Sequence, residues 1–320
     1  MLSTSHWSSF SLFFSASYTQ QYLKNIYEQN KIENAEQKAY ENCYPFIYYL
    51  EHGKVYYEQG KHSPLIIQPI LLFYGLVHLI KACILTVDPN YPETTSVLAH
   101  GVSARKRKKQ HFHFFQDEVK FQKTGLFPFL ANKLFHMEHL EGDKISMGNL
   151  FKQVPELNSL LLFLDGVPSF TNIYHEENEF FIPKKVLDFF HMTENRFLDF
   201  FSEKAVEEYH FKRLEHEFIV FEKDNKRGSF NYIPLKYNLA DQTYALPLTK
   251  DIGFIFHELL VHYLLLYNLS MIARYETEWW SELVKTMPNK DFPLIETFLQ
   301  VSIEKGPFLV YEYLTKAGHR

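Results

Sequence analysis

Cysteine and glycine are scarce in this sequence. Two cysteines, Cys43 and Cys83, occur in 320 residues, and 12 glycines stand against 31 phenylalanines and 21 tyrosines. Two cysteines are too few for a disulfide framework, so we predict two buried free thiols and a cytoplasmic protein. Scarce glycine argues against a phosphate-cradling loop and against a β-barrel with many tight turns. The many large rings instead favour packed helices with an aromatic core.

Long apolar runs without ionisable side chains are also lacking. The stretches 65–87 and 256–273 are strongly apolar, but the first contains Lys81 and the second contains Glu258. A membrane-spanning helix needs about 20 mostly apolar residues, and an ionised group near its centre is costly. We therefore expect both stretches to be core helices of a soluble protein, with no membrane span.

The sequence has no excess of positive charge. Its formal net charge is −5, which excludes a protein that binds nucleic acid through a basic surface as a whole. There is nevertheless one dense basic run, made of Arg105, Lys106, Arg107, Lys108 and Lys109. Such a run is either a phosphate-contacting surface or a solvated loop. We favour the solvated loop and keep docking to nucleic acid or to a membrane surface as the alternative.

Motifs of the common enzyme classes are absent as well. We find no P-loop, no G-x-G-x-x-G, no G-x-S-x-G and no C-x-x-C. His257 and His262 resemble the histidine pair of a zinc-binding helix, but that motif places its ligands four residues apart. A spacing of five puts the two side chains about 140° apart around a helix. We therefore predict no metal site and no cofactor, and lean against catalysis.

The elements that are present follow the order helices, strands, helices. This order favours an α+β fold, predominantly α-helical, with a small strand-rich middle region. We predict an N-terminal helical region at 1–110, a mixed middle region with short strands at 111–250, and a C-terminal helical region at 251–320. The C-terminal region is expected to pack with the N-terminal helices.

Local patterns place the individual elements. Residues 157–164 form a short apolar run that suits a helix or a strand. The predicted helices lie at 19–50, 63–85 and 183–209, and from 251 almost to the end with breaks at Pro288, Pro293 and Pro307. The predicted strands lie at 111–122 (a strand pair), 217–222, 230–235 and 243–248, with a hairpin turn at 225–228.

Two apolar helices carry a line of polar residues. In the first, Tyr263, Tyr267, Ser270 and Arg274 share one side at positions i, i+4, i+7 and i+11. We favour a partly exposed stripe on an amphipathic helix. The alternative is the lining of a ligand pocket, in which Arg274 meets an anion or a carboxylate because guanidinium suits forked acceptors. Neighbouring glutamates, Glu276 and Glu278, are candidate partners for Arg274.

The second line consists of Tyr74, His78 and Lys81 on one side of the predicted helix 63–85. A buried lysine must find a partner or lose its charge. We modestly favour a Lys81 that extends to solvent at the helix edge. If the two lines instead converge, they form a ligand-binding site made of Tyr74, His78, Lys81, Tyr267 and Arg274.

Several segments resemble the YaaC-like proteins of Bacillus-type bacteria. They are LFYGL at 72–76, His100-Gly101 with the basic run after it, GLFP at 125–128, and LSMIARY at 269–275 followed by Trp279. The likeness covers most of the chain, and the Ala-Arg-Tyr element with Trp279 is its most specific part. It implies no particular reaction, cofactor or partner.

The N-terminal region is also similar in part to HEPN-type helical domains, many of which are metal-independent RNases with an R-x4-6-H motif. Arg105 and His111 match this spacing, as do Arg107 and His113. This likeness implies an RNase alternative in which Arg105 steadies a phosphate and His111 is the general acid or base. Our leading hypothesis is a non-catalytic binding or regulatory protein that engages a partner protein or a nucleotide-like anion.

Overall fold

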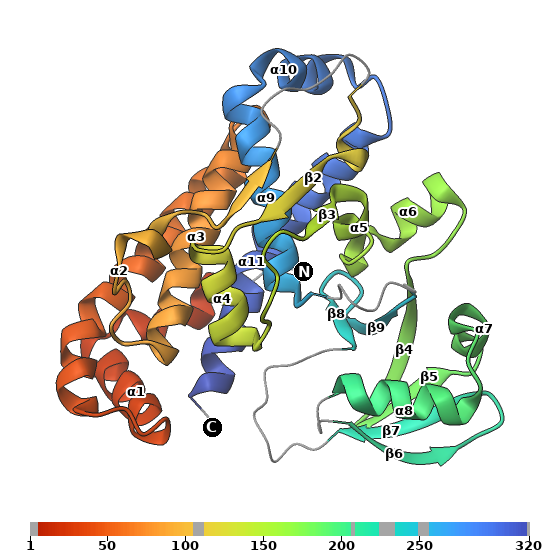
Figure 1. The fold of residues 1–320 in the computed structure, drawn as a ribbon, viewed down its shortest axis with the longest axis horizontal. Helices are drawn as coiled ribbons and strands as arrows, with labels where there is room; N and C mark the ends of the chain where they lie inside the picture. Colours follow the sequence, from red (N-terminus) through yellow and green to blue (C-terminus); the bar gives the residue numbers. More distant parts are fainter. Residues whose placement is uncertain (1–5, 105–111, 206–208, 224–233, 249–255, 319–320) are drawn as a thin grey trace. The chain divides into compact units, whose positions relative to one another are not determined.

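A computed structural model of the chain describes residues 6–104, 112–205, 209–223, 234–248 and 256–318. The chain divides into two compact units. Unit 1 comprises Met1–Leu150 and Leu259–Arg320, and unit 2 comprises Phe151–Glu258. The described part of the chain is mostly α-helical and contains two antiparallel sheets (Figure 1), which confirms the predicted α+β class. The three-region division at 110 and 250 stays a prediction about the sequence pattern.

Unit 1 begins with a 3-10 helix and three α-helices. They are η1 (His6–Phe14), α1 (Ala16–Gln29), α2 (Ala35–His62) and α3 (Gln68–Val87). The prediction of one helix over 19–50 was wrong, because the chain is interrupted between α1 and α2. Lys31 and Asn34 adopt positive φ angles of 55° and 56° there, which no α-helix continues through.

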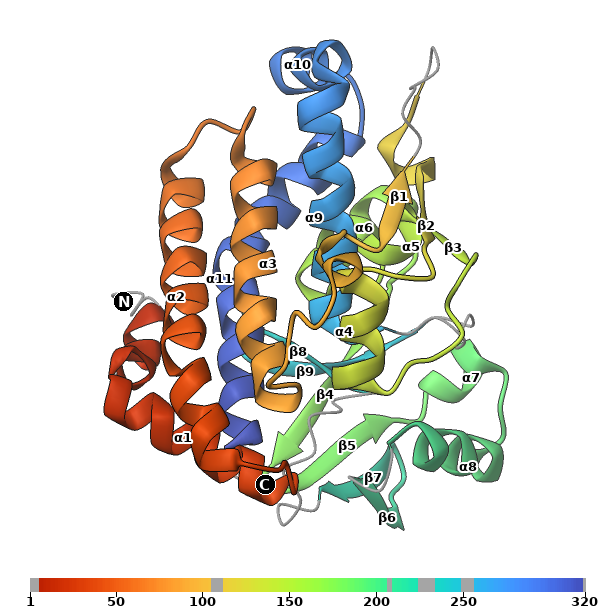
Figure 2. The same ribbon diagram turned by 60° about the vertical axis from the view of Figure 1, so that its left-hand side comes forward.

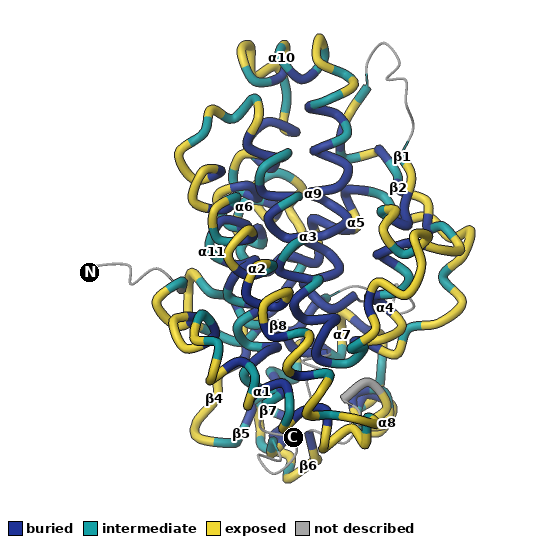
Figure 3. The backbone as a smooth tube through the Cα atoms, turned by 90° about the vertical axis from the view of Figure 1, so that its left-hand side faces the viewer, coloured by how far each residue is buried: buried dark blue, intermediate teal, exposed yellow. Residues whose placement is uncertain are grey.

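Helix α3 is the central helix of unit 1. It packs against α2, α11 and α4, and in Figures 2 and 3 it lies beside α2 and α9 as a largely buried segment. Its length and composition would allow it to cross a membrane, but 67% of its most apolar window is buried inside the protein. Burial of this kind is what the core helix of a folded domain shows. Its predicted start at Ser63-Pro64 was too early, since Pro69 occupies the first turn instead.

Three helices complete the bundle from the C-terminal part of the chain. They are α9 (Glu258–Tyr275), α10 (Thr277–Thr286) and α11 (Asp291–Ala317). Of the expected breaks, Pro288 follows the end of α10, whereas Pro293 lies in the first turn of α11. The expected break at Pro307 was wrong, because α11 continues through this residue. Helix α11 packs on α3 and on η1, so its neighbours hold it helical despite the missing backbone donor.

A three-stranded sheet lies between the helical parts of unit 1. Its strands are β1 (Val102–Ala104), β2 (Glu118–Phe121) and β3 (Lys144–Ser146), in the order β1-β2-β3. Along the chain, these strands alternate with short helices: η2 (Thr95–Leu98), η3 (Phe114–Gln116), α4 (Leu126–Phe135) and α5 (Met147–Phe151).

The predicted strand pair at 111–122 is half correct. Residues 118–121 form a strand, but 114–116 form η3 instead. The reason is a buried carboxylate: the backbone N–H groups of Phe114 and Phe115 donate to Asp291 at 2.8 and 3.2 Å. These two N–H groups are therefore not available for the hydrogen bonds of a β-sheet.

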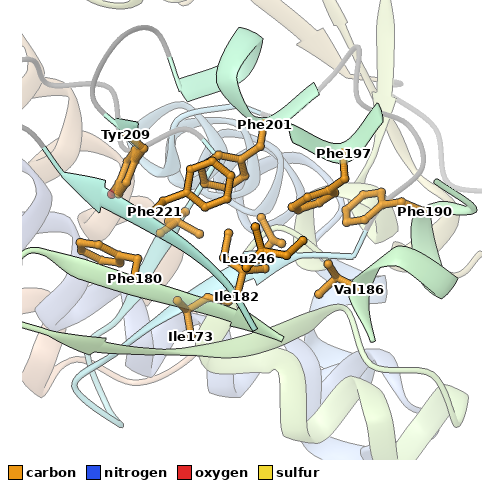
Figure 4. Close-up of a cluster of buried hydrophobic side chains, with 12 residues drawn as sticks. Ile173, Phe180, Ile182, Val186, Phe190, Phe197, Phe201, Tyr209, Phe221 and Leu246 are labelled. Atoms are coloured by element: carbon orange, nitrogen blue, oxygen red, sulfur yellow. The ribbon is translucent and has the colours of Figure 1, made fainter. Parts of the chain in front are cut away.

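Unit 2 contains a six-stranded antiparallel sheet in the order β6-β7-β5-β4-β9-β8. Figure 4 shows its core, in which Phe197 and Phe201 of the helix above meet Phe221 and Ile182 of the sheet. The elements are η4 (Pro155–Leu157), α6 (Asn158–Asp165), β4 (Phe170–Glu176), β5 (Glu179–Pro183), α7 (Val186–Phe190), α8 (Glu194–Ala205), β6 (Tyr209–Leu214), β7 (Phe218–Lys223), β8 (Lys236–Asn238) and β9 (Thr243–Pro247).

The sequence pattern placed some of these elements and missed others. Strands at 217–222 and 243–248 are confirmed, and the ambiguous run 157–164 is a helix. The single helix predicted over 183–209 is instead two, since His191 after α7 has a φ of 51°. The predicted turn at 225–228 and most of the predicted strand 230–235 lie outside the described residues. Strands β4, β5 and β6 were not predicted.

Candidate functional site

The two polar lines of the sequence meet on one side of unit 1. Helix α3 contributes Tyr74, His78 and Lys81, and α9 contributes Tyr267 and Arg274. Helix α2 and the loop before β1 add four further residues that line the same surface. We call the whole set the cation–ring face: Tyr49, His52, Tyr56, Tyr74, His78, Lys81, His100, Tyr267 and Arg274.

Arg274 is half-buried at the C-terminal end of α9 and joins this helix to α3. Its Nη1 donates a hydrogen bond of 2.9 Å to the hydroxyl of Tyr74, and its Nε donates to the carbonyl of Ser270 at 3.1 Å. The guanidinium carbon lies 5.6 Å from the ring centre of Tyr74 and 5.3 Å from that of Tyr275. Cation–π contacts of this kind attract the guanidinium without neutralising its charge.

His100 lies between the aromatic residues of α3 and α9. Its ring centroid is 5.1 Å from Phe73, 5.5 Å from Tyr267 and 6.3 Å from Tyr74. Its backbone carbonyl accepts a hydrogen bond of 2.8 Å from the hydroxyl of Tyr263, which fixes the loop on α9. Burial lowers the pKa of His100, and the positive charges of Arg274 and Lys81 lower it further. The imidazole is therefore biased towards its neutral form.

His78 is enclosed by rings of α2. It stacks on Tyr56, with centroids 5.6 Å apart and an interplanar angle of 17°. His52 meets it edge-on at 5.1 Å, and Tyr49 lies at 6.1 Å. Burial, followed by the charge of Lys81 and by His52, lowers the pKa of His78 to about 4. Its Nδ1 atom is buried and has no hydrogen-bond partner among the described residues.

Lys81 stands one turn beyond His78 on α3. Its Nζ lies 5.6 Å from the ring centre of Tyr49, and burial lowers its pKa. Within the described part of the chain, neither Lys81 nor Arg274 pairs with a carboxylate. Glu276 and Glu278, which the sequence suggested as partners of Arg274, do not pair with it, because the Tyr74 hydroxyl occupies that position. The face therefore holds two cations that form no ion pair with an acidic side chain in the described part of the chain.

The structure excludes one interpretation of the α9 line, whereas Lys81 on α3 is partly exposed, which is consistent with the favoured side chain that extends to solvent. The favoured exposed stripe on α9 is wrong, because Tyr263, Tyr267 and Ser270 are buried and every residue of α9 up to Ser270 is buried. The five predicted ligand-binding residues lie on one surface, and their role in binding stays a prediction. His52, Tyr49, Tyr56 and His100 were missed. The spacings of three and four between Tyr49, His52 and Tyr56 along α2, and the His-Gly pair at 100–101, were the available signals.

The other predicted site lies outside the described residues. Arg105, Lys106, Arg107, Lys108, Lys109 and His111 all fall in the segment 105–111. His113, which follows it, is described: its Nδ1 lies 3.6 Å from the buried carboxylate of Asp291. The RNase alternative and the phosphate-contacting run therefore stay predictions.

His262, the second histidine of the pair that resembles a zinc-binding helix, is fully buried. Its Nδ1 shares a hydrogen bond of 2.9 Å with the hydroxyl of Ser302 on α11, and its ring packs on Phe298. This contact gives His262 a structural role between α9 and α11. Among the described residues no group of three or more His, Cys, Asp or Glu side chains is arranged to hold a metal ion. Cys43 and Cys83 are buried free thiols, as predicted.

Comparison with known proteins gives a family and no activity. The family model described as "YaaC-like Protein" matches residues 11–314, which is nearly the whole chain. No curated protein and no solved structure matches the sequence. The match includes every residue of the cation–ring face. The chain therefore belongs to the YaaC-like family.

Proposed function

We propose that this protein is a non-catalytic binding protein that holds an anionic ligand on the cation–ring face. The observation that carries the proposal is the pair Lys81 and Arg274, two cations on one face with no carboxylate partner among the described residues. A half-buried cation without a counter-ion loses solvation and gains little in return. A bound ligand with an anionic group and hydrogen-bond acceptors on this face would offset this loss.

The hydrogen-bonding groups of Arg274 fit this role. A guanidinium has five N–H donors, and in Arg274 two of them are used by Ser270 and Tyr74. A third group, Nη2, faces the weak acceptor sulfur of Met271 at 3.2 Å. Two N–H groups, one on Nη1 and one on Nη2, remain for a ligand, and a guanidinium can bind a phosphate or carboxylate through two nitrogens in a forked manner.

The absence of recognisable catalytic motifs and the two buried thiols support a binding role in the cytoplasm. A partner protein with an acidic segment would satisfy the same cations as a small anion. The RNase alternative rests on Arg105 and His111, and no described contact favours it. We therefore place the small-molecule anion first.

The test is a thermal-shift and calorimetry screen with ring-bearing and ring-free anions, namely nucleotides, pyrophosphate and citrate. We expect at least one of them to bind, and Lys81→Ala or Arg274→Ala to weaken it about tenfold or more, since a charge-assisted hydrogen bond is worth about 1.5–3 kcal/mol. Lys54→Ala is the matched control: Lys54 also lies over a ring, that of Phe14, but has Glu58 as a carboxylate neighbour. A screen without hits, or hits unaffected by both variants, overturns the proposal.

A further inference from the structure

The cation–ring face has two chemically different ends. One end has hydrogen-bond donors for an anion. Two of the five N–H groups of Arg274 make no hydrogen bond to a described residue, Tyr74 offers a hydroxyl, and the ring of His100 makes no hydrogen bond to a described residue. Phe73 and Tyr267 pack against His100 and position it there. These groups supply hydrogen-bond donors and one full positive charge, that of Arg274.

The other end is built from ring faces. Tyr56 and His78 are stacked, His52 meets His78 edge-on, and Tyr49 completes the group beneath the ammonium of Lys81. Burial keeps the pKa of His78 near 4, so this imidazole is uncharged at neutral pH. Its Nδ1 is buried and makes no hydrogen bond to a described residue, so this atom is not exposed to a ligand and the group offers ring surface instead. Uncharged stacked rings with isolated hydrogen-bonding atoms suit a flat heterocycle better than a second anion.

The separation of the ends sets the size of the ligand. Tyr74 and Lys81 are seven residues apart on α3, which corresponds to about 10 Å along the helix. Inorganic phosphate is too small to contact both ends at once. A molecule that occupies both must carry its anionic group and its ring system at opposite ends.

On the basis of the proposed function, we infer that the ligand is a nucleoside phosphate whose phosphate binds at Arg274, Tyr74 and His100 and whose base stacks on the rings of Tyr56 and His78. Lys81 is then a hydrogen-bond donor to an acceptor atom on the base. This orientation of the ligand follows from the forked donors of Arg274, which match a phosphate, whereas the ammonium of Lys81 is a point charge.

The test compares four nucleoside 5′-monophosphates, their nucleosides and inorganic pyrophosphate by calorimetry with the full chain. At least one monophosphate should bind tenfold or more tightly than its nucleoside. Arg274→Lys keeps the charge and removes the fork, so it should weaken the monophosphate about tenfold and leave the nucleoside unchanged. Tyr56→Leu should weaken both nucleoside and monophosphate and leave pyrophosphate unchanged, while Tyr56→Phe, the matched control, keeps the ring and the affinity.

Each result separates this inference from the proposed function. If pyrophosphate binds as tightly as every monophosphate and Tyr56→Leu has no effect, the anion site stands and the nucleoside assignment is overturned. If Lys81→Ala removes the tighter binding of the monophosphate over its nucleoside and Arg274→Lys does not, the proposed orientation of the ligand is wrong. If no compound in the set binds, both the assignment and the anion site fail. Thermal melting of each variant checks that it is folded.

Discussion

At the scale of single residues, the surroundings of a histidine side chain can shift its pKa far from the usual value. His78 is half-exposed, yet rings on three sides and the neighbouring Lys81 lower its pKa from the usual 6.5 to about 4. His139 is 94% exposed and has no such surroundings.

His78 makes the folded protein less stable at mildly acidic pH. Between about pH 6.5 and pH 4 the unfolded chain binds a proton at this residue and the folded chain does not, so the free energy of unfolding falls as the pH falls. We expect the melting temperature to drop between pH 7 and pH 5, and the drop to be a few degrees smaller in His78→Phe. Solvent screening at this partly exposed position keeps the effect small.

The measurement is calorimetry at pH 7, 6 and 5. His139→Ala is the control for the substitution itself, since it removes a histidine whose side chain is 94% exposed. An identical response in His78→Phe would contradict the lowered pKa of His78.

At the scale of elements, close approach of α2 and α3 brings the rings of the cation–ring face together. A Cβ at Gly75 would lie 2.7 Å from Cδ2 of Tyr57 and 3.1 Å from Cβ of Tyr56. A Cβ at Gly53 would in turn meet the backbone oxygen of Gly75 at 3.3 Å. Glycine at these positions lets the two helix backbones pack directly, and so sets the distance at which Tyr56 stacks on His78.

Replacing Gly75 by alanine should therefore separate the helices. We expect Gly75→Ala to lower the free energy of unfolding by about 1–3 kcal/mol, because an added methyl forces the buried ring of Tyr57 to move. Gly60→Ala is the matched change on α2: its Cβ would lie 3.0 Å from the flexible Cδ2 of Leu72, so the cost should be smaller or offset by higher helix propensity. Urea unfolding of both variants measures the difference, and equal stabilities would refute the close-packing argument.

At the scale of the whole molecule, the chain divides into two compact units, and one buried hydrophobic cluster lies entirely within unit 2. The core of unit 2 is a cluster in which Phe201 lies 4.2 Å, centroid to centroid, from Phe221. None of the residues of this cluster belongs to unit 1. A change in this core should therefore act first on unit 2.

We expect Phe201→Ala to lower the stability of unit 2 by about 3–5 kcal/mol, through lost burial and a cavity. Hydrogen exchange followed by mass spectrometry should show faster exchange in β5, β7 and α8, with little change in α3, α9 and α11. Ile303→Ala on α11 should show the opposite pattern. Equal acceleration in both units would mean that they unfold as one cooperative body.

Local sequence patterns determined the helical framework. Apolar periodicity and prolines predicted α3, the C-terminal helices and the mostly helical class, because these signals act over a few neighbouring residues. The same patterns missed β4, β5 and β6 and failed to place the breaks at Asn34 and His191. Strands depend on pairing with distant segments, and a positive φ is set by the packing around it.

Only the tertiary structure showed that the two polar lines meet on the same side of unit 1. From the sequence, Lys81 and Arg274 could be solvated side chains on separate helices. Their surroundings on one face arise because α2, α3 and α9 pack together, and Arg274 bonds Tyr74 across 200 residues of chain. No local pattern encodes that contact, since burial energy is gained by whole helix faces and the polar groups between them meet as a result.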